Sequence, residues 1–146
     1  MATKDTITYD ANLFEQYKTV ALQANKASNM AAQEANNNRT ERTRLEITMS
    51  DLQKENKRIE HELKAQASSI EGLKNADMRS AFVSDNLQKN SRYINNLEAI
   101  KTYEHQLNQI DTTISQHTVE RDYNNRLYEV YLESMRFITA NTIANK

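Results

Sequence analysis

The 146-residue chain contains no cysteine, no proline, no tryptophan and a single glycine, Gly72. Without cysteine it can form no disulfide and perform no thiol chemistry, which fits a reducing compartment. Sheets and sandwiches need turn residues at roughly every 8–12 positions, and this chain has almost none. A single glycine also cannot build a glycine-rich phosphate loop. These absences predict an all-α protein.

Neither sign of charge dominates. Lys and Arg number 19 and Asp and Glu number 20, which gives a net charge of −1. No global field therefore favours a polyanion or a membrane surface. The first ten residues lack the apolar core of a signal peptide, and no run approaches the roughly 18 apolar residues of a membrane span. We expect a cytoplasmic protein with no membrane partner.

The sequence has instead an unbroken heptad pattern of the kind that winds helices into a left-handed supercoil. Charged residues surround it at helical spacing, as on a solvated face. Position a holds Phe14, Ala21, Ser28, Ala35, Arg42, Met49, Asn56, Leu63 and Ile70. Position d holds Tyr17, Ala24, Ala31, Asn38, Leu45, Leu52, Ile59, Gln66 and Leu73.

Gly72 interrupts this pattern where a helix C-terminal glycine belongs, and Asn75 follows as an N-cap candidate. We expect a flexible N-terminus over 1–9, a first long helix over 10–71 and a turn over 72–75. A second long helix over 76–140 and a flexible C-terminus over 141–146 complete the single domain. Within the second helix, Ser84 or Asn90 is a candidate for a further break.

The second arm carries its own apolar pattern. Two arms of nearly equal length around one break predict an antiparallel helical hairpin, a coiled coil folded near residues 73–74. The small residues of the first arm would then face the region of Ile114, His117 and Tyr123. The second pattern runs through Ile100, Tyr103, Leu107, Ile110, Ile114, His117, Arg121, Asn124, Tyr128, Tyr131, Met135 and Ile138.

Polar residues interrupt the seam, and a buried polar group needs a partner. The fold-back places Asn38 near Gln109, Arg42 near Glu104, and Asn56 near Asn90 and Ser91. The rival reading has Asn56 meeting its own copy across a parallel oligomer, which would leave an extended rod. The polar seam residues that would set register or partner are Asn38, Arg42, Asn56 and Gln66.

The sequence shows no catalytic or metal-binding pattern. "HELKA" resembles the H-E-x-x-H zinc motif but has Ala65 at the second histidine position. No Glu stands three residues before a His, so the pattern of di-iron bundles is missing too. We predict no catalytic residue, no metal site, no cofactor and no enzyme activity.

Two segments raise the question of nucleic acid. "RDYNNRLYEVYLESMRF" interleaves Arg with aromatic residues, as in proteins that stack single-stranded bases and neutralise phosphate. "NNNRTERTR" has three arginines and little acid. The favoured alternatives are that the tyrosines pack in the seam and that the second segment is an ordinary polar helix. The candidate DNA contacts are Arg39, Arg42, Arg44, Arg121 and Arg126.

A two-helix hairpin buries only one seam, so apolar residues beside it stay partly exposed. Exposed apolar stripes of this length mark contacts with another protein. We therefore expect a homo-oligomer or a complex with another helical protein. The candidate contacts are Val20, Leu22, Leu97, Leu127 and Leu132.

The segment "LKNADMRSAFVSDNLQKNSRYINNLEAIKTYEHQLNQID" begins with an Asn–small–acidic–x–Arg helix start and continues as a long charged helix. In this it resembles small helical coiled-coil proteins of tailed bacteriophages. The general layout is also similar to that of UvsY-type recombination mediators, which are helical, oligomeric and help to load a recombinase on single-stranded DNA. The resemblance covers about a quarter of the chain.

Two classes of function follow. In the first, the chain is a non-catalytic helical interaction or assembly protein encoded by a phage and acting in the host cytoplasm, with single-stranded DNA recombination or replication as the setting that the resemblance implies. In the second, it is a structural or scaffolding coiled-coil component of a particle or secretion assembly and does not contact nucleic acid. The balanced charge favours contacts with protein over contacts with DNA.

Overall fold

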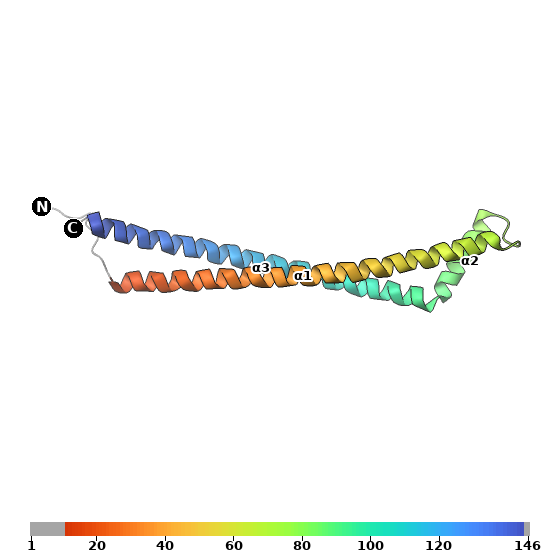
Figure 1. Ribbon diagram of the computed structural model, residues 1–146, viewed down its shortest axis with the longest axis horizontal. Helices are drawn as coiled ribbons and strands as arrows, with labels where there is room; N and C mark the ends of the chain where they lie inside the picture. Colours follow the sequence, from red (N-terminus) through yellow and green to blue (C-terminus); the bar gives the residue numbers. More distant parts are fainter. Residues whose placement is uncertain (1–10, 145–146) are drawn as a thin grey trace. The chain divides into compact units, whose positions relative to one another are not determined.

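The computed structural model describes residues 11–144, and all its regular structure is helical. Helix α1 spans Ala11–Ser69, α2 spans Ala76–Lys89 and α3 spans Ser91–Ala144 (Figure 1). The described part contains no strand, which confirms the all-α prediction. Residues 1–9 and 145–146, expected to be flexible, lie outside the described residues. The expected end of the last helix at residue 140 is too early, because α3 continues to Ala144.

Helix α1 runs for 59 residues without a glycine or a proline to interrupt it. Many of its polar residues compete for backbone hydrogen bonds in other settings, but here their side chains bond to the carbonyl one turn back. Thr19 Oγ1 donates to the Glu15 carbonyl at 2.9 Å, and Asn38 Nδ2 donates to the Glu34 carbonyl at 2.8 Å. These bonds occupy the polar side chains without stabilising the helix, so the helical state depends mainly on packing against α2 and α3.

The turn after α1 includes the predicted residues 72–75, but α1 ends at Ser69 and not at residue 71. Gly72 is not required there by its backbone conformation. None of the described residues has a positive φ, so Gly72 does not adopt the left-handed conformation of a glycine C-cap. Asn75 does act as the N-cap of α2: its backbone is extended, and its side chain accepts a hydrogen bond from the Met78 amide at 2.8 Å.

The second arm is broken at Asn90, so the prediction of one helix over 76–140 is wrong. Asn90 has extended backbone, with φ −83° and ψ 105°, and its amide bonds to the Leu87 carbonyl at the end of α2. The Asn90 side chain then accepts a hydrogen bond from the Tyr93 amide at 2.9 Å, which caps the start of α3. One asparagine thus ends one helix and begins the next, and the other candidate, Ser84, lies inside α2.

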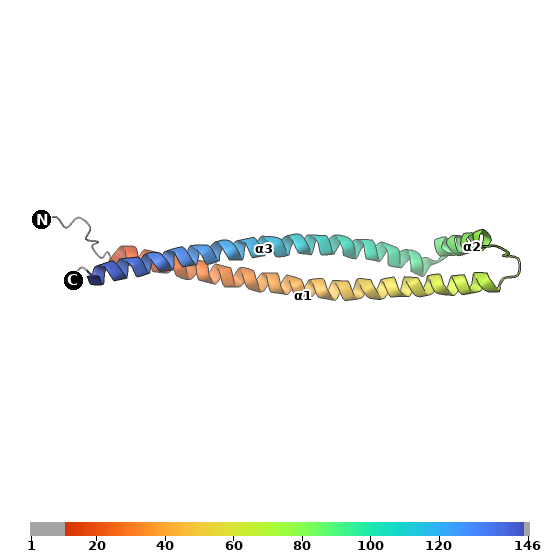
Figure 2. The ribbon, with the colours of Figure 1, turned by 90° about the horizontal axis from the view of Figure 1, so that it is seen from above.

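The chain forms two compact units, each with parts of α1 and α3. The first comprises Met1–Asn38 and Thr112–Lys146. In it the rings of Tyr17 and Tyr131 meet edge to face with centroids 5.3 Å apart, and Ser28 contacts Asn125. As the number rises on α1 it falls on α3, so the two helices run antiparallel in this unit (Figure 2).

The second unit, Arg39–Asp111, also contains α2. Here Arg42 contacts Asp111, and Asn56 contacts Asn96, again in antiparallel order. Helix α2 lies against the end of α1, and the two line a groove of about 430 Å³ with Ala67 on one side and Val83 and Leu87 on the other. No residue of α2 is fully buried, so this helix is the least packed of the three.

A stripe of small residues on α1 forms the core of the first unit. Its five members, which we call the small-residue stripe, are at most 3% exposed. Helix axes come closer when the side chains between them are small. The predicted counterpart is partly wrong, because Tyr123 is exposed on α3 and does not fill the space beside the stripe. The stripe consists of Ala21, Ala24, Ser28, Ala31 and Ala35.

We expect Ala31→Leu to lower the free energy of unfolding by about 1–3 kcal/mol, because the added methyl groups must push two closely packed helices apart. The control is Gln33→Leu, which adds a leucine on the exposed face of the same helix. Urea denaturation followed by circular dichroism measures both. Equal stability for the two variants would show that α1 and α3 are not closely packed at Ala31.

We expect Gly72→Ala to be neutral or to raise the free energy of unfolding by up to about 1 kcal/mol. A Cβ atom built at Gly72 meets no atom within 4 Å, and the backbone there suits alanine. The gain would come from the smaller conformational freedom of the unfolded chain. Lys74→Ala, an exposed substitution in the same turn, is the control in the same urea titration. A clear loss of stability in Gly72→Ala alone would mean that the turn needs glycine.

Candidate functional site

The four residues expected to form the polar seam differ in burial and in their contacts. Asn56 is buried at 5% exposure, and Arg42 reaches across to α3. Asn38 bonds to its own helix instead of to α3. Gln66 is exposed, and its neighbour Ala67 is buried at the groove with α2. The heptad register therefore ends before Gln66, because α2 and not α3 lies against this end of α1.

Asn56 finds its partner within the same chain. The Asn96 side chain donates to Asn56 Oδ1 at 2.9 Å, and Asn56 Nδ2 donates to the Tyr93 carbonyl at 3.4 Å. Both amides are buried, so an unpartnered one would carry a desolvation cost. The expected contact with Asn90 and Ser91 is wrong, since the break at Asn90 makes the second arm pair further along its sequence.

The start of α3 makes two more polar contacts with α1. The Tyr93 hydroxyl donates to Glu60 Oε1 at 3.1 Å, and Arg92 forms an ion pair with Glu55. Partial burial, together with the hydrogen bond to the Glu60 carboxylate, raises the pKa of Tyr93, so its hydroxyl remains a donor. The sequence reading missed these pairs. Tyr93 and Asn96 extend the heptad pattern of Ile100 toward the N-terminus, and this spacing could have identified them as residues that face α1.

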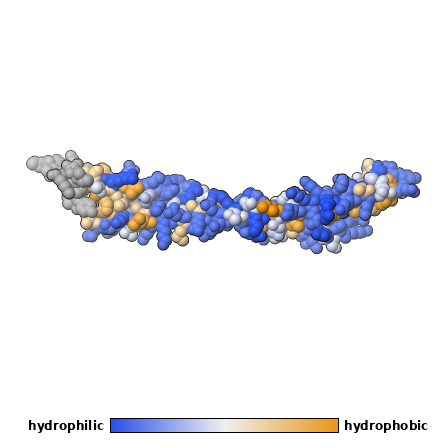
Figure 3. Space-filling model, in the orientation of Figure 1, coloured by the Kyte–Doolittle hydropathy of each residue, from blue (hydrophilic) through white to orange (hydrophobic). Residues whose placement is uncertain are grey.

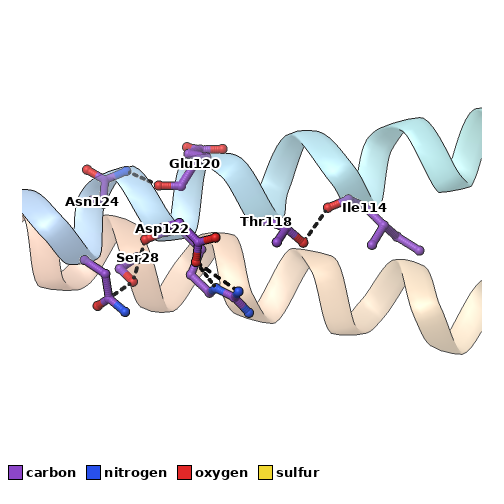
Figure 4. Close-up of polar contacts among 8 residues, drawn as sticks. Ser28, Ile114, Thr118, Glu120, Asp122 and Asn124 are labelled. Atoms are coloured by element: carbon purple, nitrogen blue, oxygen red, sulfur yellow. Dashed lines mark hydrogen bonds and ion pairs between the residues drawn. The ribbon is translucent and has the colours of Figure 1, made fainter.

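In the first unit, Ser28 bridges the two helices directly. Its hydroxyl lies 3.3 Å from the Arg121 carbonyl and 3.2 Å from Asn125 Oδ1, and Figure 4 shows Ser28 facing α3. A serine side chain is short, so it reaches a backbone carbonyl of a neighbouring helix only where the helices are close together. This contact is a direct sign of the close packing that the small-residue stripe allows.

Three of the five candidate DNA-binding arginines are paired with carboxylates. Arg42 bonds to Asp111 at 2.6 Å and to Glu46, which is not the expected Glu104. Arg44 bonds to Glu41 with Nε 3.0 Å from Oε2, and Arg121 bonds to Asp122 at 2.9 Å. The Arg44 hydrogen bond lowers the pKa of Glu41, so that carboxylate stays charged beside its arginine. These contacts compete with phosphate for the same donors.

The candidate arginines also point in different directions. An α-helix turns by about 100° per residue, so Arg42 and Arg44 lie about 160° apart around α1. Arg121 and Arg126 lie about 140° apart around α3. Arg39 and Arg126 are exposed, and Arg126 makes no ion pair with the side chains that the structure describes. The two arginine groups that the sequence suggested are therefore not single phosphate-binding faces.

The aromatic cluster of α3 divides between the seam and the surface. Tyr128 and Tyr131 are half-buried, as expected for seam residues. Tyr123 and Phe137 are 63% and 58% exposed, and Val130 between them is 59% exposed. On the face drawn in Figure 3, apolar side chains gather over the part of the first unit where α1 begins and α3 ends.

The expected oligomer contacts are only partly exposed. Leu22 and Leu97 are exposed, whereas Val20, Leu127 and Leu132 are half-buried beside the seam. A second set of exposed apolar residues was not predicted as oligomer contacts from the sequence. This set consists of Tyr123, Val130 and Phe137 on α3, with Leu13 on α1. The three α3 residues are spaced by seven and fall outside the positions of the seam, and this spacing could have identified them.

Within residues 11–144, no helix combines the length and apolar character that a membrane crossing needs. The same residues contain no group of three or more His, Asp or Glu side chains arranged to hold a metal ion. Comparison with protein-family models, with curated proteins and with solved structures gives no match.

We expect Asn56→Ala to lower the free energy of unfolding by about 1–3 kcal/mol, because it leaves the Asn96 amide buried without its acceptor. Asn96→Ala should cost a similar amount, but the double variant should cost less than the sum. Asn56→Ala combined with Asn95→Ala, at an exposed neighbouring asparagine, is the control and should be additive. Urea denaturation of the five variants measures these values. Additivity in both pairs would show that Asn56 and Asn96 do not interact.

Proposed function

We propose that this chain is a non-catalytic helical interaction protein that works through contacts with other protein surfaces. The observation that supports this best is the exposed apolar set on α3. Tyr123, Val130 and Phe137 are spaced by seven residues and are 63%, 59% and 58% exposed. Large apolar side chains in water are unfavourable, and a contiguous group of them marks a contact surface.

The seven-residue spacing of these exposed side chains indicates that the partner is itself a helix. Residues seven apart stay in line along a helix only when the helix winds with a partner helix into a left-handed supercoil. The antiparallel pairing of α1 and α3 is, in this proposal, a coiled coil with one side left for a further helix. The partner would be another coiled-coil helix, either from a second copy or from a different protein.

The proposed setting comes from the resemblance to phage proteins. An accessory or assembly factor in single-stranded DNA recombination or replication would need such a surface to hold its protein partners. A structural or scaffolding component of a particle or secretion assembly would need the same surface. The two settings differ in whether the chain also touches nucleic acid.

One observation favours a nucleic-acid contact as the second candidate. Tyr123 and Phe137 are exposed, and Arg126 and Arg136 stand close to them in the sequence. Neither arginine makes an ion pair with the side chains that the structure describes. Exposed aromatic rings stack on bases, and arginines beside them neutralise phosphate.

The charges around this surface favour protein over DNA. Glu120, Glu129 and Glu133 are all exposed on the same stretch of α3 and would repel a phosphate backbone. The other candidates, Arg42, Arg44 and Arg121, are already paired with carboxylates. The protein-contact proposal therefore needs no existing interaction to break.

Single-strand binding at two salt concentrations separates the two candidates. Phosphate contacts make affinity fall steeply between about 50 and 200 mM salt, whereas apolar contacts respond little. We expect no salt-dependent binding of single-stranded DNA by the unchanged chain.

Two variant sets make the result specific. The first set carries Arg126→Ala and Arg136→Ala. The second set carries Arg39→Ala, Arg42→Ala and Arg44→Ala. The control carries Arg58→Ala and Arg79→Ala. Binding that falls with salt and is lost in either of the first two sets, but not in the control, would contradict the protein-contact proposal. It would also identify the arginines that hold the strand.

A further inference from the structure

Helix α3 carries a second seam beside the one that packs on α1. Starting at Tyr123, apolar or small residues recur at steps of four and three, which is the spacing of a coiled-coil contact. None of these residues belongs to the set that continues the α1 contact through Tyr128, Tyr131, Met135 and Ile138. The second seam consists of Tyr123, Leu127, Val130, Ser134 and Phe137.

The second seam borders a groove between the two helices of the first unit. The groove has a volume of about 500 Å³. From α1 it is lined by Leu13 and Tyr17, and from α3 by Val130, Ser134 and Phe137, among others. A helix laid along the second seam would therefore touch both helices of this unit. The new surface is continuous with the existing α1–α3 contact.

The charges at the edge of the second seam are arranged in a self-complementary way. Arg126 and Glu133 are seven residues apart, so they lie on the same edge of α3 in a supercoiled helix. Both are exposed, and neither forms an ion pair with the side chains that the structure describes. Their charges are opposite. An antiparallel copy of this helix would present a glutamate to the arginine and an arginine to the glutamate.

We propose that a second copy of this chain docks on the second seam, with its α3 antiparallel to the first α3. This inference rests on the proposed function, because it names the partner of the same apolar surface. Leu127 of each copy packs against Val130 of the other, and Arg126 of each copy faces Glu133 of the other. The two-fold symmetry of such a dimer makes every contact occur twice.

The antiparallel direction follows from the size and charge of the seam residues. In this register Tyr123 meets Ser134 of the other copy, so a large side chain faces a small one. A parallel dimer would place Tyr123 against Tyr123 and Phe137 against Phe137. It would also leave Arg126 and Glu133 facing uncharged residues, whereas the antiparallel dimer pairs opposite charges at both ends.

Sedimentation of the full chain tests the surface, and the chain offers a matched control. Val130→Glu puts a carboxylate in the second seam, and Ile47→Glu puts one at an exposed apolar position of α1 in the second unit. Val130 and Ile47 are both 59% exposed, so neither change disturbs the buried seam between α1 and α3. We expect Val130→Glu to raise the dimer dissociation constant roughly tenfold or more, because it would bury an unpaired charge. Ile47→Glu should leave it unchanged.

Charge reversal tests the ion pairs. Arg126→Glu alone and Glu133→Arg alone should each weaken the dimer by about two- to fivefold, the range of exposed ion pairs. A mixture of the two single variants should recover the original affinity, because all facing charges are then opposite. Unchanged affinity in both single variants would overturn the assigned register.

Disulfide cross-linking determines whether the two α3 helices run antiparallel or parallel. The chain has no native cysteine, so only the introduced cysteines can form disulfides. Tyr123→Cys and Ser134→Cys are prepared separately, mixed and oxidised. Antiparallel docking predicts mainly mixed disulfide dimers, whereas parallel docking predicts mainly dimers of each variant with itself, which would contradict the proposal. A chain that remains monomeric at tens of micromolar would also overturn it. That result would leave the protein-contact function standing if single-stranded DNA is not bound.

Discussion

Two helices packed side by side can bury only one stripe of each other, and this constraint governs the rest of the molecule. In the first unit the stripe on α1 is made of small residues, so the helices pack closely enough for the Ser28 hydroxyl to reach the Arg121 carbonyl. Close packing gains dispersion contacts along the backbone. It also means that little apolar surface is removed from water for each residue of helix.

Register in the second unit depends on polar groups. A heptad of similar apolar residues can slide by seven with little loss, but a buried amide cannot slide away from its partner without a desolvation cost. Asn56 and Asn96 supply that restriction, and Tyr93 with Glu60 and Arg92 with Glu55 add to it at the start of α3. The cap at Asn90 orients the same segment, so the helix start and the register are set together.

Local patterns in the sequence predicted the parts of the fold that depend on local forces. The heptad predicted a long first helix, although α1 ends at Ser69 and not at residue 71, and the Asn75 cap marked the start of α2. Both features are decided by neighbours within a few residues. Pairing between the arms was less accurate. Asn56 meets Asn96 and not Asn90, because the fold-back prediction treats the second arm as one continuous helix, whereas the chain breaks at Asn90. The arginines were misjudged as a group, since the ion pair from Arg42 to Asp111 depends on the register between distant segments.

The exposed apolar surface follows from the same limit, because one side of α3 faces α1 and the neighbouring flank does not. Where the second seam borders the groove, α1 contributes the large side chains of Leu13 and Tyr17, yet Val130 and Phe137 on α3 remain 59% and 58% exposed. The small-residue stripe begins only at Ala21 and does not line this groove. The stretch of α3 from residue 120 to residue 136 carries seven charged residues, and two of them, Arg126 and Glu133, form no ion pair with the described side chains. In the proposed dimer, a surface that is apolar along its middle and carries opposite charges seven residues apart along one edge would be covered by an antiparallel copy of itself. The pairing of α1 with α3 along one stripe therefore leaves a flank of α3 for a third helix.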